Sequence, residues 1–156
     1  SLTLDKVAQR AGVSKGGLIY IYPDRETLIE AALAREIARF RTATERHLPR
    51  GTLSGSTAED LLRAFATESL NEDDASLGKL AYLVVALLDT PERLAPFRAF
   101  YDDLLAVLMQ SGTRPEVLMR FFAIEGLSFL RAFQVARIPQ DLWEKVIGDA
   151  GGPPSA

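Results

Sequence analysis

The 156-residue sequence contains no cysteine and only one histidine, His47. A disulfide framework and a thiolate metal site are therefore excluded, and a single histidine leaves little basis for zinc chemistry or for Ser-His catalysis. The sequence also lacks an apolar run long enough to span a bilayer and a signal peptide at its N-terminus. We therefore expect a cytoplasmic protein with no metal, no cofactor and no membrane partner.

Two adjacent pairs of acidic residues, Asp73-Asp74 and Asp102-Asp103, are the features closest to a catalytic site. Adjacent side chains on a helix diverge by about 100° and do not face each other, so neither pair forms a catalytic dyad. We interpret these residues as solvated charges and expect that the protein is not an enzyme.

Most apolar residues recur at spacings of three and four, and strand-like alternation is weak throughout. The pattern predicts an all-α protein whose helix ends are marked by capping residues, glycine and proline. Residues 49–56 form the clearest linker, and residues 149–156 are expected to be a flexible tail. The predicted helices cover 4–11, 15–20, 24–47, 56 or 57–71, 74–88, 91–112, 115–136 and 139–148.

The net charge of −3 conceals an uneven distribution along the chain. Residues 1–50 contain nine Lys and Arg against six Asp and Glu, whereas residues 51–156 contain nine against fifteen. The positive charge that could contact phosphates therefore lies in the N-terminal part.

Residues 3–22 have the sequence features of a helix-turn-helix. Thr3 caps a first short helix, and Gly12 suits the left-handed conformation that ends this helix and turns the chain. Ser14 then caps a second helix, in which Leu18 can pack against the first. The opposite face would enter the major groove of DNA, which admits one helix. This face contains Lys15, Gly17 and Tyr20.

This segment resembles the DNA-binding signature of the TetR family, in which Thr opens one helix and Ala-Gly-Val-Ser leads into the recognition helix. The continuation at 23–28 resembles the start of the connecting helix of that family. The resemblance in motif covers residues 3–33, and beyond them it extends only to a helical body of suitable length. It implies that the DNA-binding residues are Thr3, Ser14, Lys15, Gly16, Gly17, Tyr20, Tyr22 and Arg25.

The resemblance implies a helix-turn-helix DNA-binding domain at 1–23 and a helical bundle for ligand binding and dimerisation at 24–148, called the body below. In the family another helix precedes the motif, and the sequence begins at Ser1 without it. We therefore expect the DNA-binding domain to be truncated at its N-terminus and poorly supported. Ile21 stands where many family members have His or Tyr, so one backbone contact with DNA is expected to be absent.

The same resemblance implies a homodimeric repressor that binds a palindromic operator in double-stranded DNA and responds to an unidentified small molecule. The alternative is a helical dimer that binds a small molecule without reading DNA. In that case the N-terminal helices would serve only for packing. The affinity for operator DNA separates the two hypotheses.

Residues 121–133 are apolar on nearly every side, so a helix there must be covered on more than one side. The body can cover one side, and a second subunit is the natural cover for the other. The resemblance implies a twofold interface through the last two helices. A central core helix in a monomer is the alternative. The candidate interface residues are Ala123, Gly126, Leu127 and Leu130.

The body contains many aromatic residues, and aromatic walls with a few polar groups are typical of small-molecule sites. Glu125 is the one acid within the apolar run, and a buried carboxylate needs a partner. It would line a pocket for a cationic or hydroxylated ligand, pair across a dimer, or face water. Alternatively the aromatic rings interlock and leave no void. The candidate pocket residues are Phe65, Tyr82, Phe97, Tyr101, Phe121 and Glu125.

Overall fold

The computed structural model describes residues 2–110, 112 and 114–152, and it confirms the all-α class. These residues contain no strand, and none of their helices is both long and apolar enough to cross a membrane. The elements are α1 (Leu4–Ala11), α2 (Lys15–Ile21), α3 (Arg25–Glu45), α4 (Ala58–Asn71), α5 (Asp74–Val85), the 3₁₀ helix η1 (Pro91–Leu94), α6 (Ala95–Met109), α7 (Pro115–Ala132) and α8 (Gln140–Gly151).

Side-chain caps determine where the first five helices begin. In each case a hydroxyl or carboxylate oxygen accepts a hydrogen bond from the backbone amide three residues later. This bond satisfies one of the free N–H groups of the first turn, so the helix starts at a defined residue. The capping residues are Thr3 for α1, Ser14 for α2, Asp24 for α3, Thr57 for α4 and Asp73 for α5.

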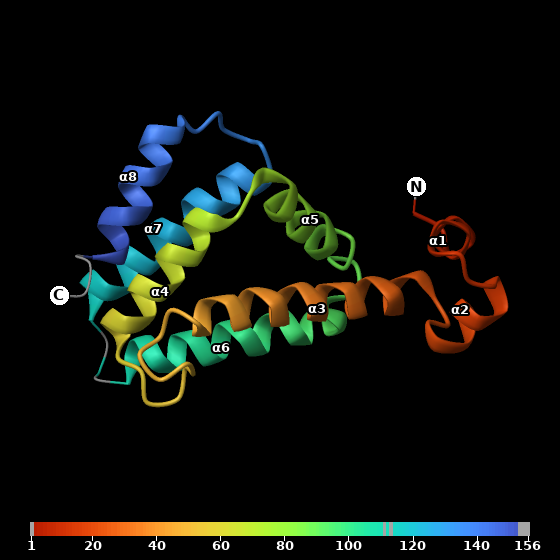
Figure 1. Ribbon diagram of the computed structural model, residues 1–156, viewed down its shortest axis with the longest axis horizontal. Helices are drawn as coiled ribbons and strands as arrows, with labels where there is room; N and C mark the ends of the chain where they lie inside the picture. The colour runs from red at the N-terminus through yellow and green to blue at the C-terminus, as the bar shows by residue number, and fades with distance from the viewer. Residues whose placement is uncertain (1, 111, 113, 153–156) are drawn as a thin grey trace.

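Helix α3 joins the two parts of the molecule (Figure 1). The small α1 and α2 lie at one end of α3, away from the other helices. Along the rest of its length α3 packs against α4, α5 and α6, and α8 packs on α4 and α7. The body is therefore a helical bundle, and the helix-turn-helix projects from it on the end of α3.

Helix α4 lies at the centre of the body because other helices cover most of its sides. α3, α6, α7 and α8 all pack against it. The ring of Phe65 lies with its centroid 5.3 Å from those of Phe40 and Phe121. Such aromatic pairs add about 0.5–1.5 kcal/mol each to the effect of burial. The other buried residues of α4 are Ala58, Leu61, Leu62, Ala64, Ala66, Glu68 and Ser69.

The single helix predicted over residues 91–112 is wrong, because two elements occupy this stretch. η1 covers Pro91–Leu94, and α6 then runs from Ala95 to Met109. A proline inside a helix removes a hydrogen bond, and its ring clashes with the carbonyl four residues earlier. Because a new helix starts at Ala95, Pro96 lies in the first turn, where its missing N–H has no consequence.

Three other helix ends differ from the prediction by three residues or more. α5 ends at Val85 instead of residue 88, and α7 ends at Ala132 instead of residue 136. α8 continues past Gly148 to Gly151, so the predicted tail is helical at 149–151, and these last residues pack against α4. Residues 153–156 of that tail lie outside the described residues.

Gly151 is expected to be required for the packing of α8 on α4. An added Cβ at Gly151 would lie 2.6 Å from the Cβ of Ala66, closer than two carbon atoms approach without displacement. Gly151→Ala should therefore lower the free energy of unfolding by about 1–3 kcal/mol through overpacking. An added Cβ at Gly148, in the same helix, meets no atom within 4 Å. Gly148→Ala should raise stability by about 0.5–1 kcal/mol. Urea unfolding measures both, and equal effects would contradict the close approach of the helices.

Candidate functional site

Helices α1 and α2 form a small helix-turn-helix. Ala8 and Leu18 are the buried residues among positions 2–22, with 3% and 8% of their surfaces exposed. Gly12 has a φ of 69°, and the amides of Gly12 and Val13 donate to carbonyls at the end of α1, which turns the chain toward α2. Because this core is so small, the orientation of α1 and α2 depends strongly on their attachment to α3.

The face of α2 predicted to contact DNA is uncovered. Tyr20 is 90% exposed, and an added Cβ at Gly16 would meet no atom within 4 Å. The ammonium of Lys15 lies 2.8 Å from the carboxylate of Asp5 on α1. Exposed ion pairs contribute little, so Lys15 can exchange Asp5 for a phosphate at small cost. Gly17 instead serves the helix start, since its amide donates to Ser14 Oγ at 3.1 Å.

Tyr22 and Arg25 lie where α2 meets α3. Tyr22 is half-buried, and Arg25 Nη1 lies 3.2 Å from Glu26 Oε1. The interaction with Tyr82 of α5 and, to a smaller extent, that with Glu26 raise the pKa of the Arg25 guanidinium. Tyr82 is 47% exposed and does not line the cavity described below, so its prediction as a pocket residue is corrected. Tyr82 instead lies close to Arg25 at the start of α3.

Arg93 of η1 ties the first turn of α3 to the body. Its guanidinium donates to Thr27 Oγ1 at 2.9 Å, to Glu30 Oε2 at 3.2 Å and to Asp24 Oδ2 at 3.2 Å. Asp24 is the cap of α3, and its Oδ1 accepts from the amide and hydroxyl of Thr27 at 2.6 and 2.7 Å. These bonds from Thr27, together with Arg93, hold the pKa of Asp24 below its usual value. The 3₁₀ helix η1 therefore contacts the residue that directly follows the helix-turn-helix.

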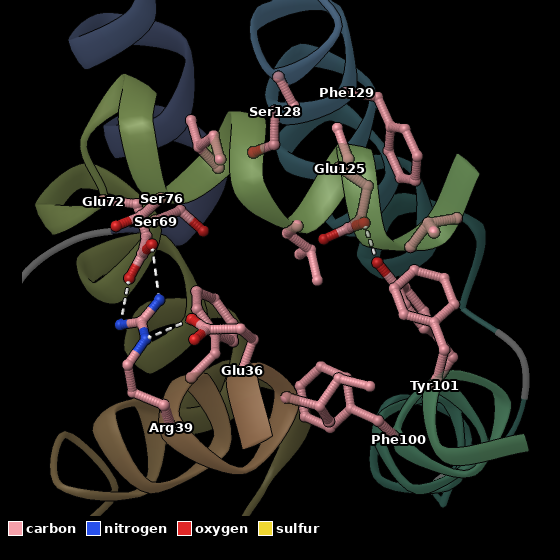
Figure 2. A pocket seen from close by; sticks show the side chains of 18 of the residues that line it. Glu36, Arg39, Ser69, Glu72, Ser76, Phe100, Tyr101, Glu125, Ser128 and Phe129 are labelled. Atoms are coloured by element: carbon pink, nitrogen blue, oxygen red, sulfur yellow. Dashed lines mark hydrogen bonds and ion pairs between the residues drawn. The ribbon is translucent and has the colours of Figure 1, made fainter. Parts of the chain in front are cut away.

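The body contains a cavity of about 90 Å³ between α3, α4, α5, α6 and α7 (Figure 2). Most of its lining is apolar, and polar side chains gather at two ends. At one end lie Tyr101, Glu125 and Ser128; at the other lie Glu36, Arg39, Ser69, Glu72 and Ser76. Apolar walls with a few polar groups at defined places are what a small-molecule site requires.

Glu125 of α7 and Tyr101 of α6 meet at the first end of the cavity. The Tyr101 hydroxyl donates a hydrogen bond to Glu125 Oε2 (Figure 2). Burial raises the pKa of the Glu125 carboxyl to about 7, although the hydrogen bond from Tyr101 acts in the opposite direction. Burial and the negative charge of Glu125 also raise the pKa of Tyr101. The cavity thus contains an acid that titrates close to neutral pH.

Arg39 occupies the second end of the cavity. It donates to both carboxylate oxygens of Glu72 at 2.8 and 2.9 Å, and its Nε donates to Glu36 Oε2 at 3.2 Å. The ammonium of Lys79 lies 2.9 Å from the other oxygen of Glu36. The ion pairs link α3 to α5 and to the end of α4, and they leave the charge of Arg39 balanced.

The sequence located part of the cavity lining. Phe65, Phe97, Tyr101 and Glu125 all line it. Phe121 does not, and its prediction is corrected: it is fully buried in the core, against the ring of Phe65. Sequence reasoning missed the ion pairs at the second end. The only available signal was the spacing of Glu36, Arg39 and Phe40, which places an acid, a base and an aromatic ring on one side of α3.

One side of α7 is uncovered in the part of the chain that the structure describes. Ala123, Gly126 and Leu130, predicted for a dimer interface, are exposed on it. Leu127 is half-buried and packs against the core of the body, so only part of its side chain is open to a second subunit. The other exposed apolar residues follow the same spacing of three and four, and they are Met119, Phe122, Phe129 and Phe133. An apolar stripe of this length is typical of an interaction surface.

A family model described as "Tetracyclin repressor-like, C-terminal domain" matches residues 59–149. The match spans α4 to nearly the end of α8 and covers more than half of the 156-residue chain. It does not include residues 3–33, so it is independent of the helix-turn-helix motif. No curated protein and no solved structure matches the chain.

Glu125→Gln should remove a pH-dependent loss of stability. The native pKa of about 7 exceeds the ordinary value of 4.5, so the folded state binds more protons than the unfolded state between these values. Stability should therefore fall as the pH rises from about 4.5 to about 7. Gln has the same shape, stays uncharged and can still accept the Tyr101 hydrogen bond. The variant should be more stable than the wild type by roughly 2–4 kcal/mol above pH 7.

Urea unfolding at pH 5, 6, 7 and 8 measures this difference. Glu116→Gln is the matched control, because Glu116 is exposed in the first turn of the same helix and its pKa is lowered. It should leave the profile above pH 5 unchanged. Parallel profiles for Glu125→Gln and the wild type would show that the carboxyl is not desolvated.

Proposed function

The chain belongs to the tetracycline repressor-like family, and from this we propose that it is a transcriptional regulator that binds operator DNA and responds to a small molecule. The helix-turn-helix at 1–23 would contact DNA, and the body at 24–148 would dimerise and bind the ligand. We propose a regulator of the cytoplasm and not an enzyme. The main support is the uncovered face of α2, on a correctly capped helix pair at the free end of α3 (Figure 1).

Insertion of α2 into a major groove would bring the exposed side chain of Tyr20 and the open backbone at Gly16 to the base edges. Lys15 would leave Asp5 and neutralise a phosphate. Thr3 precedes α1, Tyr22 directly follows α2 and Arg25 begins α3; their hydroxyl and guanidinium groups would contact the DNA backbone. Contacts of this kind orient a protein on DNA, whereas contacts with base edges supply specificity.

We further propose that the apolar stripe on α7 is the dimer interface. Gly126 lies in the middle of the stripe and, without a side chain, lets a second helix approach closely. A twofold dimer formed through this face would bury the exposed apolar residues of both subunits in one contact. It would also present two helix-turn-helix segments to the two half-sites of a palindrome.

Repression follows in this account from occupancy of a promoter by the ligand-free dimer. A ligand would release the DNA if it bound more tightly to an arrangement in which the two helix-turn-helix segments no longer match the half-sites. Arg93 provides a physical link for this change. It precedes the cavity residues Phe97 and Tyr101 along the chain and binds the cap of α3.

The dimer should bind a palindrome whose half-site centres lie about 34–36 Å apart, or a multiple of that distance. On the site captured from genomic DNA, Tyr20→Ala should weaken binding by about tenfold or more through loss of a base contact. Lys15→Ala should reduce the slope of log affinity against log salt by about one. Fluorescence anisotropy at several salt concentrations measures both effects.

Lys145→Ala is the matched control for this test, because Lys145 is an exposed lysine on α8, far from α2. It should leave both affinity and salt slope unchanged. If Tyr20→Ala and Lys15→Ala bind as the wild type does, α2 does not read DNA.

The dimer interface is tested by Gly126→Trp and Leu130→Asp. The first should prevent close helix approach, and the second should bury an unpaired charge. Each should raise the dimer dissociation constant by about tenfold or more. Ala106→Trp, on the exposed side of α6, is the control and should have no effect. Light scattering and analytical ultracentrifugation give the masses, and a monomeric wild type at micromolar concentration would refute the interface.

A further inference from the structure

The charges that line the cavity are not balanced. The charged lining residues are three acids, Glu36, Glu72 and Glu125, and one base, Arg39. Arg39 is already bound to Glu72 and Glu36 at the second end of the cavity. Among the described lining residues no other base is available, so Glu125 has no counter-ion from the protein.

Glu125 keeps an open position for a ligand. Tyr101 donates to Oε2, while Figure 2 shows the other carboxylate oxygen turned toward the interior of the cavity. The Ser128 side chain, one turn further along α7, also lies at this end. Glu125 is half-buried, and a partly desolvated carboxylate with no protein cation beside it is stabilised when a bound group supplies the positive charge.

The raised pKa of Glu125 agrees with this geometry, because it reflects desolvation without a compensating base. Aromatic rings beside the carboxylate add to the preference for a cation. Phe97 and Tyr101 have ring centroids 4.9 Å apart and both line the cavity. The faces of such rings attract an ammonium group.

We propose that the cavity binds a small protonated amine with a compact apolar body, whose ammonium group pairs with Glu125. This inference rests on the proposed function, since it names the class of molecule to which the regulator responds. The ammonium donates to the vacant Glu125 oxygen, and the apolar body lies between the phenylalanine and aliphatic side chains of α3, α5 and α6. An anionic ligand is disfavoured because it would add a charge to an acidic cavity.

The size of the cavity limits the apolar body. Its volume of about 90 Å³ is smaller than the ~150 Å³ cavity that accommodates benzene in an engineered protein. A chain of a few carbon atoms therefore fits without rearrangement. A larger ring requires displacement of the stacked Phe129 and Phe133, which line the cavity and are each about 40% exposed.

The test compares head groups on one body: pentylamine, 1-pentanol and pentanoate, titrated into the full chain by calorimetry at pH 8. A charged hydrogen bond at this site should give pentylamine an affinity about 10–100-fold higher than that of 1-pentanol. Pentanoate should bind most weakly. Glu125→Gln should remove the preference for the amine and leave the affinity for 1-pentanol within about threefold.

Two further variants separate the charge from the surrounding structure. Tyr101→Phe removes the hydroxyl but leaves the carboxylate, so it should keep the amine preference. Glu116→Gln, on the exposed part of α7, should behave as the wild type. An amine preference that persists in Glu125→Gln, equal binding of pentanoate, or no binding of pentylamine at millimolar concentration would each overturn the assignment.

These measurements need no DNA, so the ligand class is tested separately from the proposed function. If pentylamine binds through Glu125 but leaves operator binding unchanged, the ligand class stands and the regulatory role fails. If operator DNA binds but pentylamine does not bind the body, the regulatory role stands and the ligand class fails.

Discussion

The continuity of α3 is the constraint on which the rest of the structure depends. Its 21 residues form one uninterrupted helix of about 30 Å, capped by Asp24 next to the helix-turn-helix. Further along, Glu36, Arg39 and Phe40 line the cavity. Because an α-helix is stiff over this length, a displacement of its cavity-lining part also moves the end to which α1 and α2 are attached. Helix α3 therefore connects the cavity directly to the proposed DNA-binding face.

A second connection joins the cavity to the start of α3. The Tyr101 hydroxyl of α6 donates a hydrogen bond to Glu125, and η1 directly precedes α6 in the chain. Arg93 of η1 binds Asp24, the cap of α3. A ligand that separates α6 from α7 would thus displace η1 and the first turn of α3 together. Because Ala8 and Leu18 are the only buried residues of the described part of α1 and α2, the orientation of these two helices depends on α3.

Local sequence predicted what local physics determines. The caps Thr3, Ser14 and Asp24 correctly predicted where the first three helices begin, and Gly12 predicted the turn between the first two. Each of these residues acts on backbone groups within four residues of it. The cavity was predicted less well, since residue identity does not say which face of a helix meets a neighbour. For that reason the predictions for Phe121, which packs into the core, and Tyr82, which is half exposed, were wrong. The pairing of Arg39 with Glu72 joins residues far apart in sequence, so no local pattern could predict it.

Coupling between the cavity and the helix-turn-helix is the central claim, and the absence of cysteine makes it directly measurable. Gln9→Cys, on the exposed side of α1, provides one spin-labelling site per subunit. Pulsed electron resonance then gives the distance between the two labels across the proposed dimer, with and without pentylamine. The account predicts that the ligand shifts this distance in the dimer and that Arg93→Ala reduces the shift. An unchanged distance in a protein saturated with ligand would contradict it.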